Sequence, residues 1–175
     1  MTSALTRRLV FASTLANSFL YGMNINRAIV DMHAWQQTGP LAWAAFSRHA
    51  DLAPRAALLY PGSAFAGVIL SAAAALSLRH DRGAPRSAWM PIIAAPVLAA
   101  SGLLMTTKAA PNMLRVPRLG NDAAGLQQAL DGFQFWGNIR GLLQVLAYVA
   151  SLWSLVAIAD ANRLPAGSIQ GGLRA

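Results

Sequence analysis

The residues of this chain that could do chemistry fall into two polar stripes, each spaced like one face of a helix. At 100° per residue the first stripe covers an arc of about 80°, bordered by Arg27, and it consists of Asn17, Tyr21, Asn24 and Asp31. The second covers a similar arc of about 80° and consists of Trp136, Arg140, Gln144 and Ser151. Both lie in otherwise apolar segments, where amides and charges are costly unless they face other protein groups or a wet cavity. The spacing therefore predicts that the two stripes face each other.

Four residues are candidates for direct catalysis. His33, His49 and Asp31 could act as a base, and Arg140 could stabilise the anion that forms when a base removes a proton. The histidines occur as Asp31-x-His33 and His49-x-Asp51. Two imidazoles with carboxylates could hold copper, zinc or iron with open coordination positions, although this spacing matches no recognised metal motif. The metal content is therefore open between no cofactor and a metal such as copper at His33 and His49.

A purely structural role is the alternative interpretation of the same residues. Asn and Gln side chains commonly join membrane helices by hydrogen bonds worth about 1 kcal/mol each. Asp31 follows Arg27 by one helical turn, which allows a local ion pair. Arg140 enters its own helix at a comparable depth. Under either interpretation we expect Arg27, Asp31 and Arg140 to form one buried or half-buried polar cluster.

Charged residues are scarce and unevenly distributed along the chain. Of its 175 residues 11% are charged and 55% are apolar, whereas soluble domains have about 25% charged residues. Four windows of 18 to 23 residues contain no charge, and roughly 20 residues are needed for a helix to cross a membrane. The pattern predicts an all-α polytopic membrane protein. We expect one domain, a four-transmembrane-helix bundle over residues 1–163, with spans at about 8–31, 55–79, 88–109 and 133–159.

Composition also limits the compartment and the partners. The absence of cysteine excludes disulfides, thiolate metal sites and cysteine nucleophiles. The formal charge of +8 comes from arginines at the ends of the apolar windows, where they indicate membrane orientation and headgroup contact rather than nucleic-acid binding. More basic loop residues lie on the side of the N-terminus. This predicts cytoplasmic N- and C-termini in a bacterial cytoplasmic membrane.

The two outer connections are longer than a helical bundle requires. Thr38-Gly39-Pro40 is a helix-start signal, and Leu41, Trp43 and Phe46 after it predict a short helix in the membrane interface. The second connection predicts a short helix from Asn121 or Asp122 to about Asp131. Residues 164–175, which contain Pro165 and three glycines, are predicted to form a disordered tail.

The plan of the chain combines four membrane-length helices with an Asn-rich first helix and two short motifs, Pro111-Asn112-Met113-Leu114 and Trp136-Gly137-Asn138-Ile139-Arg140. Over roughly residues 10–158 this plan resembles the anthrone-oxygenase-like family of small membrane proteins. Named members of that family take part in oxidising anthrone-type polyketides to anthraquinones. The resemblance implies that Asn112, Trp136, Asn138 and Arg140 are the matching site positions.

These features leave two main classes of function and a weaker third. The first is an oxygenase-type enzyme for a lipophilic aromatic substrate, in a polar cavity near the outer membrane surface, where Arg140 or Lys108 would stabilise an enolate. Its substrate-binding residues would be Asn17, Tyr21, Asn24, Arg27, Asn112, Trp136, Asn138 and Gln144. The second class is a non-enzymatic accessory or assembly subunit of a larger membrane complex. The possible partners are therefore the lipid bilayer, an aromatic substrate, and either a larger membrane complex or, as a homo-oligomer, further copies of the chain. A transporter is less favoured, because no charge occupies a helix centre.

Overall fold

A computed structural model describes residues 1–163 of the chain. Within these residues the fold is entirely helical and contains no strand, which confirms the predicted all-α class. The tail predicted for residues 164–175 lies outside the described residues.

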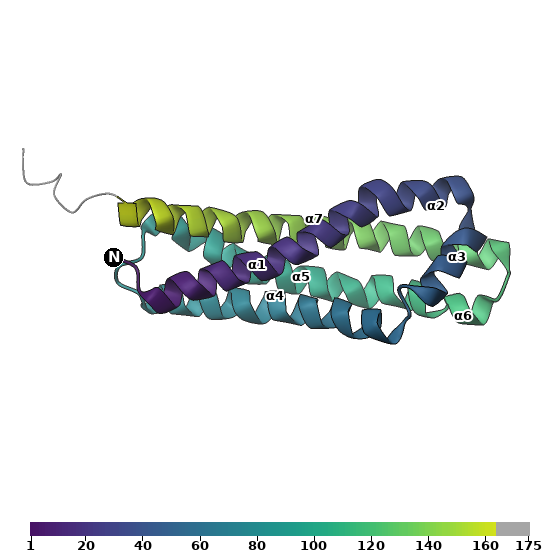
Figure 1. Cartoon of the computed structure of the whole chain (residues 1–175), viewed down its shortest axis with the longest axis horizontal. Helices are drawn as coiled ribbons and strands as arrows, with labels where there is room; N and C mark the ends of the chain where they lie inside the picture. Colours follow the sequence, from purple (N-terminus) through teal and green to yellow (C-terminus); the bar gives the residue numbers. More distant parts are fainter. Residues whose placement is uncertain (164–175) are drawn as a thin grey trace, which may run out of the picture.

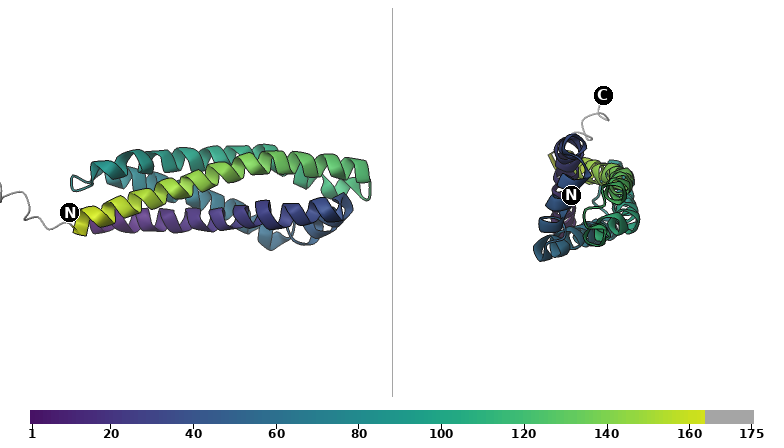
Figure 2. Two further views of the ribbon diagram at one scale, coloured as in Figure 1. Left: turned by 90° about the horizontal axis from the view of Figure 1, so that it is seen from above. Right: turned by 90° about the vertical axis from the view of Figure 1, so that its right-hand side faces the viewer.

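Four long helices run along the length of the molecule (Figure 1), and they consist of α1 (Ala4–Asn26), α4 (Pro54–His80), α5 (Trp89–Leu114) and α7 (Ala123–Arg163). Helix α1 packs on α4 and α7, and α5 packs on the same two helices. Seen end-on, they surround a common axis (Figure 2). The polar stripes on α1 and α7 therefore belong to neighbouring helices.

Three segments are long and apolar enough to cross a membrane, judged by length and composition. They are Pro54–His80, Arg86–Leu119 and Ala123–Arg163. The second combines the 3-10 turn η2 (Arg86–Ala88), α5 and the short helix α6 (Val116–Leu119). Helix α1 is not among them, because its apolar residues are interrupted by polar ones such as Asn17 and Asn24. These segments support the predicted membrane class.

The first outer connection begins without a break from α1. The helix widens into a π-turn, η1 (Arg27–Asp31), and continues as α2 (Met32–Thr38). The chain then reverses at Gly39, whose φ of 87° is readily available to glycine. Helix α3 (Pro40–His49) follows at the predicted position, with Pro40 in its first turn. Trp43 on α3 is fully buried within the protein, and Leu41 and Phe46 remain about half exposed.

The second outer connection differs from the prediction. The stretch to Asp131 is not a separate short helix but the first turns of α7, which runs unbroken for 41 residues. The side chain of Asp122 caps this helix by accepting a hydrogen bond from the Ala124 N–H, at 3.2 Å. Nothing interrupts the helix after that cap, since Gly125 and Gly132 lower helix propensity without breaking hydrogen bonds.

Helix α7 is longer than a membrane crossing requires. At 1.5 Å per residue a 41-residue helix is about 60 Å long, twice the roughly 30 Å hydrocarbon core of a bilayer. The first turns of α7 instead pack with α2, α3, α6 and the end of α5. Together they form an aromatic-rich core that includes Trp35, Trp43, Leu126, Leu130 and Phe133. We call this end of the molecule the cap.

At the opposite end the N-terminus is tied to the connection between α4 and α5. The backbone N–H of Ser3 donates to Asp81 Oδ2 at 2.7 Å, and the N–H of Gly83 donates to Asp81 Oδ1 at 3.0 Å. Thr2 donates its hydroxyl to the Gly83 carbonyl and its N–H to the Asn162 side chain, each at 3.3 Å. Asp81 therefore anchors the start of α1.

The anchor at Asp81 is expected to be sensitive to acid. The hydrogen bond from the Ser3 backbone is the main reason that the pKa of Asp81 lies below its ordinary value of 3.8. A lowered pKa means that the carboxylate stabilises the fold above pH 3.8 and loses this contribution as the pH falls through the lowered value. We expect hydrogen exchange at Ser3 and Thr6 to accelerate in that acidic range, and Asp81→Asn to remove the pH dependence. An unchanged acid profile in Asp81→Asn would contradict the assignment.

Candidate functional site

The polar stripes of α1 and α7 do face each other, as predicted. Asn17 is buried and its amide nitrogen donates to the Ser71 hydroxyl on α4 at 2.9 Å and to the Ser151 hydroxyl on α7 at 3.1 Å. Ser13, one turn earlier, joins the same network through Ser71 at 2.9 Å. This network connects three helices at mid-length.

Closer to the cap the same two helices make two further contacts. The Asn24 amide donates to the Gln144 side-chain oxygen, and the rings of Tyr21 and Tyr148 stack with centroids 4.9 Å apart. Every first-stripe residue from Asn17 to Asn24 therefore has a partner inside the chain. Their arrangement fits interhelical packing, the structural interpretation offered above.

The network at Asn17 leads to a stability prediction. Interhelical hydrogen bonds in membranes contribute about 0.6–1.7 kcal/mol each, so Asn17→Leu is expected to lower the unfolding free energy by roughly 1–3 kcal/mol. Asn138→Leu is the matched control, because Asn138 is exposed on α7, and its effect should stay within about 0.5 kcal/mol. Thermal unfolding in mild detergent measures both. Equal stability of the two variants would show that the network contributes nothing.

At the cap end of α1 the polar stripe ends in an ion pair that the sequence prediction assigned wrongly. Arg27 pairs with Asp51, in the connection between α3 and α4, and not with Asp31. The Asp51 side chain is 4% exposed and also accepts a hydrogen bond from the Ser47 hydroxyl at 3.2 Å. Asp31 is more exposed and accepts only from Asn26, at 3.4 Å. A buried carboxylate without a counter-charge costs more free energy than an exposed one, which explains why Arg27 pairs with Asp51 and not with Asp31.

Three aromatic rings surround the Arg27 guanidinium. Its central carbon lies 5.8 Å from the Trp35 ring, 5.6 Å from Tyr60 and 5.4 Å from Phe133. The rings come from α2, α4 and α7, so one cation is held by three helices. Each contact lies in the distance range of a cation–π interaction. The Arg27 side chain is 17% exposed and thus largely removed from solvent.

Arg140 is the second arginine at the cap end of the polar stripes. It is half-buried on α7, where Arg27, Asp51 and Tyr60 act on it electrostatically. In the described residues the single ion pair is that of Arg27 with Asp51, so no carboxylate is paired with Arg140. We call Arg27, Asp51 and Arg140 the arginine cluster. With two guanidinium groups and one carboxylate it has an excess of one positive charge.

The remaining predicted site residues lie outside the arginine cluster. His33 and His49 are exposed on α2 and α3, and His33 Nε2 lies 3.1 Å from the Gln37 amide nitrogen. No group of three or more metal-binding side chains occurs among residues 1–163. Within that range, therefore, the two imidazoles predicted to bind copper, those of His33 and His49, are not joined by a third metal-binding side chain.

The residues suggested by the family resemblance are dispersed as well. Asn112 packs against Gly132, where an added Cβ would lie 2.7 Å from the Asn112 side-chain oxygen. Trp136 is half-buried beside the cap core and makes an edge contact with Phe135 at 5.1 Å. Asn138 is exposed. Of the four matching positions, only Arg140 belongs to the arginine cluster.

Sequence reasoning missed two members of this site. Asp51 and Tyr60 were predicted to lie at the same end as Arg27 and Arg140, but Asp51 was considered only as a neighbour of His49 in a possible metal site and Tyr60 was given no role. A weak signal existed, since Asp51 is one of only six acidic residues in an arginine-rich chain. The two hollows bordered by Arg79 and by Arg7 lie at the opposite end of the molecule.

No family model, curated protein or solved structure matches this chain. The resemblance to the anthrone-oxygenase-like family therefore stays a prediction, and the function must be argued from the arginine cluster itself.

Proposed function

We propose first that α1 is a fourth membrane-spanning helix, so that the chain crosses the membrane four times. Its large apolar side chains point outward, with Phe11, Leu15 and Phe19 between 46% and 61% exposed. Its polar residues, Ser13 and Asn17, are buried against other helices. A helix that is polar inside and apolar outside is suited to a lipid environment and not to water.

The absence of cysteine in the sequence makes this arrangement easy to test. Single cysteines at Phe11, Leu15 and Phe19 should resist a water-soluble maleimide in intact membranes, and Arg82→Cys should react only when the cytoplasmic side is accessible. Labelling of all three α1 positions would show that α1 lies outside the membrane. Reaction of Arg82→Cys from the outer side would reverse the proposed cytoplasmic location of the termini.

We further propose that the protein is an oxygenase-type enzyme acting on a lipophilic aromatic ketone of the anthrone type. The observation that supports it is the excess positive charge of the arginine cluster, in which Arg27 pairs with Asp51 and lies among the rings of Trp35, Tyr60 and Phe133. Aromatic rings suit a planar apolar substrate, and an arginine without a carboxylate suits the oxygen of an enolate. Such a substrate partitions into the bilayer and would reach the protein from the membrane.

The proposed reaction needs one base, one anion-binding group and molecular oxygen. A base removes a proton from the methylene carbon opposite the ketone, and Arg140 stabilises the resulting enolate. Oxygen accepts electrons from that carbon and forms a C–O bond, giving a hydroperoxide after protonation. Loss of water then leaves a second carbonyl, so that one oxygen atom enters the quinone and the other becomes water. Asp51 is the one carboxylate of the arginine cluster and is the candidate base, in place of the exposed histidines.

The experiment is an assay of the purified protein in lipid nanodiscs with a supplied anthrone under air. We expect protein-dependent formation of anthraquinone with one oxygen molecule consumed per product, above the rate of spontaneous oxidation. Empty nanodiscs and heat-denatured protein are the controls. Elemental analysis of the same sample shows whether activity accompanies a bound metal. Oxidation no faster than in empty nanodiscs would reject the proposal for this substrate class.

A second function, that of an accessory subunit of a larger membrane complex, is favoured by three glycines. Gly22, Gly62 and Gly137 have no atom within 4 Å of the position that a Cβ would take. Packing within the chain therefore does not explain them, whereas small residues commonly let membrane helices approach each other. Purification in mild detergent separates the possibilities. A stoichiometric partner that is lost in Gly62→Leu would support the accessory role, and a monodisperse monomer would reject it.

A further inference from the structure

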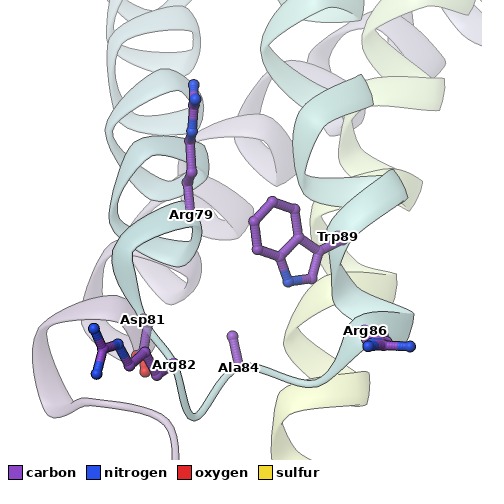
Figure 3. A pocket seen from close by; sticks show the side chains of 6 residues that line it. All are labelled: Arg79, Asp81, Arg82, Ala84, Arg86 and Trp89. Atoms are coloured by element: carbon purple, nitrogen blue, oxygen red, sulfur yellow. The ribbon is translucent and has the colours of Figure 1, made fainter.

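An open hollow of about 490 Å³ lies between the end of α4 and the start of α5. Its lining combines arginines from both sides with one aromatic ring, and Figure 3 labels it in full: Arg79, Asp81, Arg82, Ala84, Arg86 and Trp89. In that view the Arg79 side chain extends along α4 toward the body of the helix, and the Trp89 ring stands across the gap from it. Arg82 and Arg86 lie on opposite sides of the rim, and in this view their side chains extend away from the gap.

The hollow is basic because its three arginines outnumber its one acid, Asp81. Both carboxylate oxygens of Asp81 accept backbone N–H groups, from Ser3 at 2.7 Å and from Gly83 at 3.0 Å. No ion pair other than that of Arg27 with Asp51 occurs within residues 1–163, so Arg79, Arg82 and Arg86 are not neutralised there. An anion would supply the missing counter-charge.

The position of the hollow indicates where such an anion would come from. Two segments that are apolar and long enough to cross a membrane meet at it, one ending at His80 and the other beginning at Arg86. This is the level at which phospholipid headgroups contact a protein, and tryptophan is enriched there. Because Arg79 is directed along α4, an anion bound beside Trp89 would sit next to the first turns of the membrane-spanning part.

A second hollow at the same end of the molecule has a similar composition. It measures about 380 Å³ and lies between the start of α1 and the end of α7, where Arg7 and Arg8 adjoin Phe11 and Leu155. Arginines above an apolar surface match a phosphate group followed by an acyl chain. The repetition of this pattern on another pair of helices supports a lipid rather than a small soluble anion.

We propose that the hollow between α4 and α5 binds the phosphodiester headgroup of an anionic phospholipid beside Trp89, with Arg79 next to the headgroup and Arg82 and Arg86 supplying positive charge at the rim. The inference depends on the membrane location of α4 and α5 and is independent of any oxygenase activity. A free phosphate ion offers the same charge and oxygen atoms, so the experiment must distinguish the two sources.

Native mass spectrometry of the detergent-solubilised protein, titrated with phosphatidylglycerol or phosphatidylcholine, measures the bound lipid. Each basic residue near an anionic surface contributes roughly five-fold to binding, so Arg79→Gln/Arg86→Gln should weaken phosphatidylglycerol binding by roughly 10- to 30-fold. The matched control is Arg55→Gln/Arg118→Gln, which removes the same charge from exposed positions at the other end. The control pair should bind phosphatidylglycerol like the unmodified protein.

Three results would overturn the proposal. They are equal affinity for the two lipids, equal loss of phosphatidylglycerol in the two double variants, and displacement of phosphatidylglycerol by an excess of inorganic phosphate. The last would assign the hollow to a soluble anion. Thermal unfolding of both variants verifies that they are folded, and Arg79→Lys/Arg86→Lys, which keeps the charge, should retain most of the binding.

Discussion

Arg140→Gln is expected to lower the rate of anthrone oxidation by about 100- to 1000-fold, the usual effect of removing one group that stabilises a developing oxyanion. The stability of the fold should not fall, because Arg140 has no ion pair among residues 1–163 and lies close enough to Arg27 to be repelled by it. An unchanged or slightly raised unfolding temperature together with lost turnover is the expected combination. Oxygen consumption and thermal unfolding of the same preparation provide the two measurements.

The matched control for Arg140 is Lys108→Gln. The sequence made Lys108 an equal candidate for stabilising the enolate, but the structure places it exposed on α5. Its loss should change turnover less than two-fold. Arg140→Lys should recover part of the activity, since it restores the charge but not the planar pair of donors. Full activity in Arg140→Gln, or equal losses in the two glutamine variants, would remove Arg140 from the mechanism.

The helical class could be predicted from this sequence because it depends on long-range averages. The charge-free windows of 18 to 23 residues and the periodicity of 3.6 residues extend over many positions. Neither signal depends on the interpretation of a single residue. The facing of Asn17 and Asn24 toward α7 followed from the same periodicity. Helix ends were less accurate, and the helix predicted to start near residue 133 begins at Ala123. The N-cap residue Asp122 determines where α7 begins. Hydropathy does not indicate the position of an N-cap residue.

The partner of Arg27 could not be predicted by the same reasoning. Spacing along one helix offered Asp31, whereas the observed partner is Asp51, which is 24 residues away in the connection between α3 and α4. That contact depends on how α2 and α3 fold back after Gly39, and no local pattern encodes the result. The three rings around Arg27 likewise come from three different helices. Sequence spacing indicated that Arg27 would have polar partners. Tertiary packing determines which residues these partners are.

Asp51→Asn is expected to lower the unfolding free energy by about 3 kcal/mol, because it leaves the Arg27 guanidinium without a counter-charge in a largely enclosed position. Asp31→Asn is the matched control, as it makes the same chemical change one turn after Arg27. Its effect should stay within about 0.5 kcal/mol, since Asp31 makes one long hydrogen bond with Asn26.

The double variant Arg27→Gln/Asp51→Asn distinguishes a lost ion pair from a damaged cap. Removing both charges leaves no uncompensated group, so the double variant should recover much of the stability lost in Asp51→Asn. If instead the losses add, Asp51 acts mainly through its hydrogen bond from Ser47 at 3.2 Å. A larger loss in Asp31→Asn than in Asp51→Asn would restore the pairing predicted from helical spacing. Because these readouts require no substrate, they test the geometry of the arginine cluster separately from its proposed chemistry.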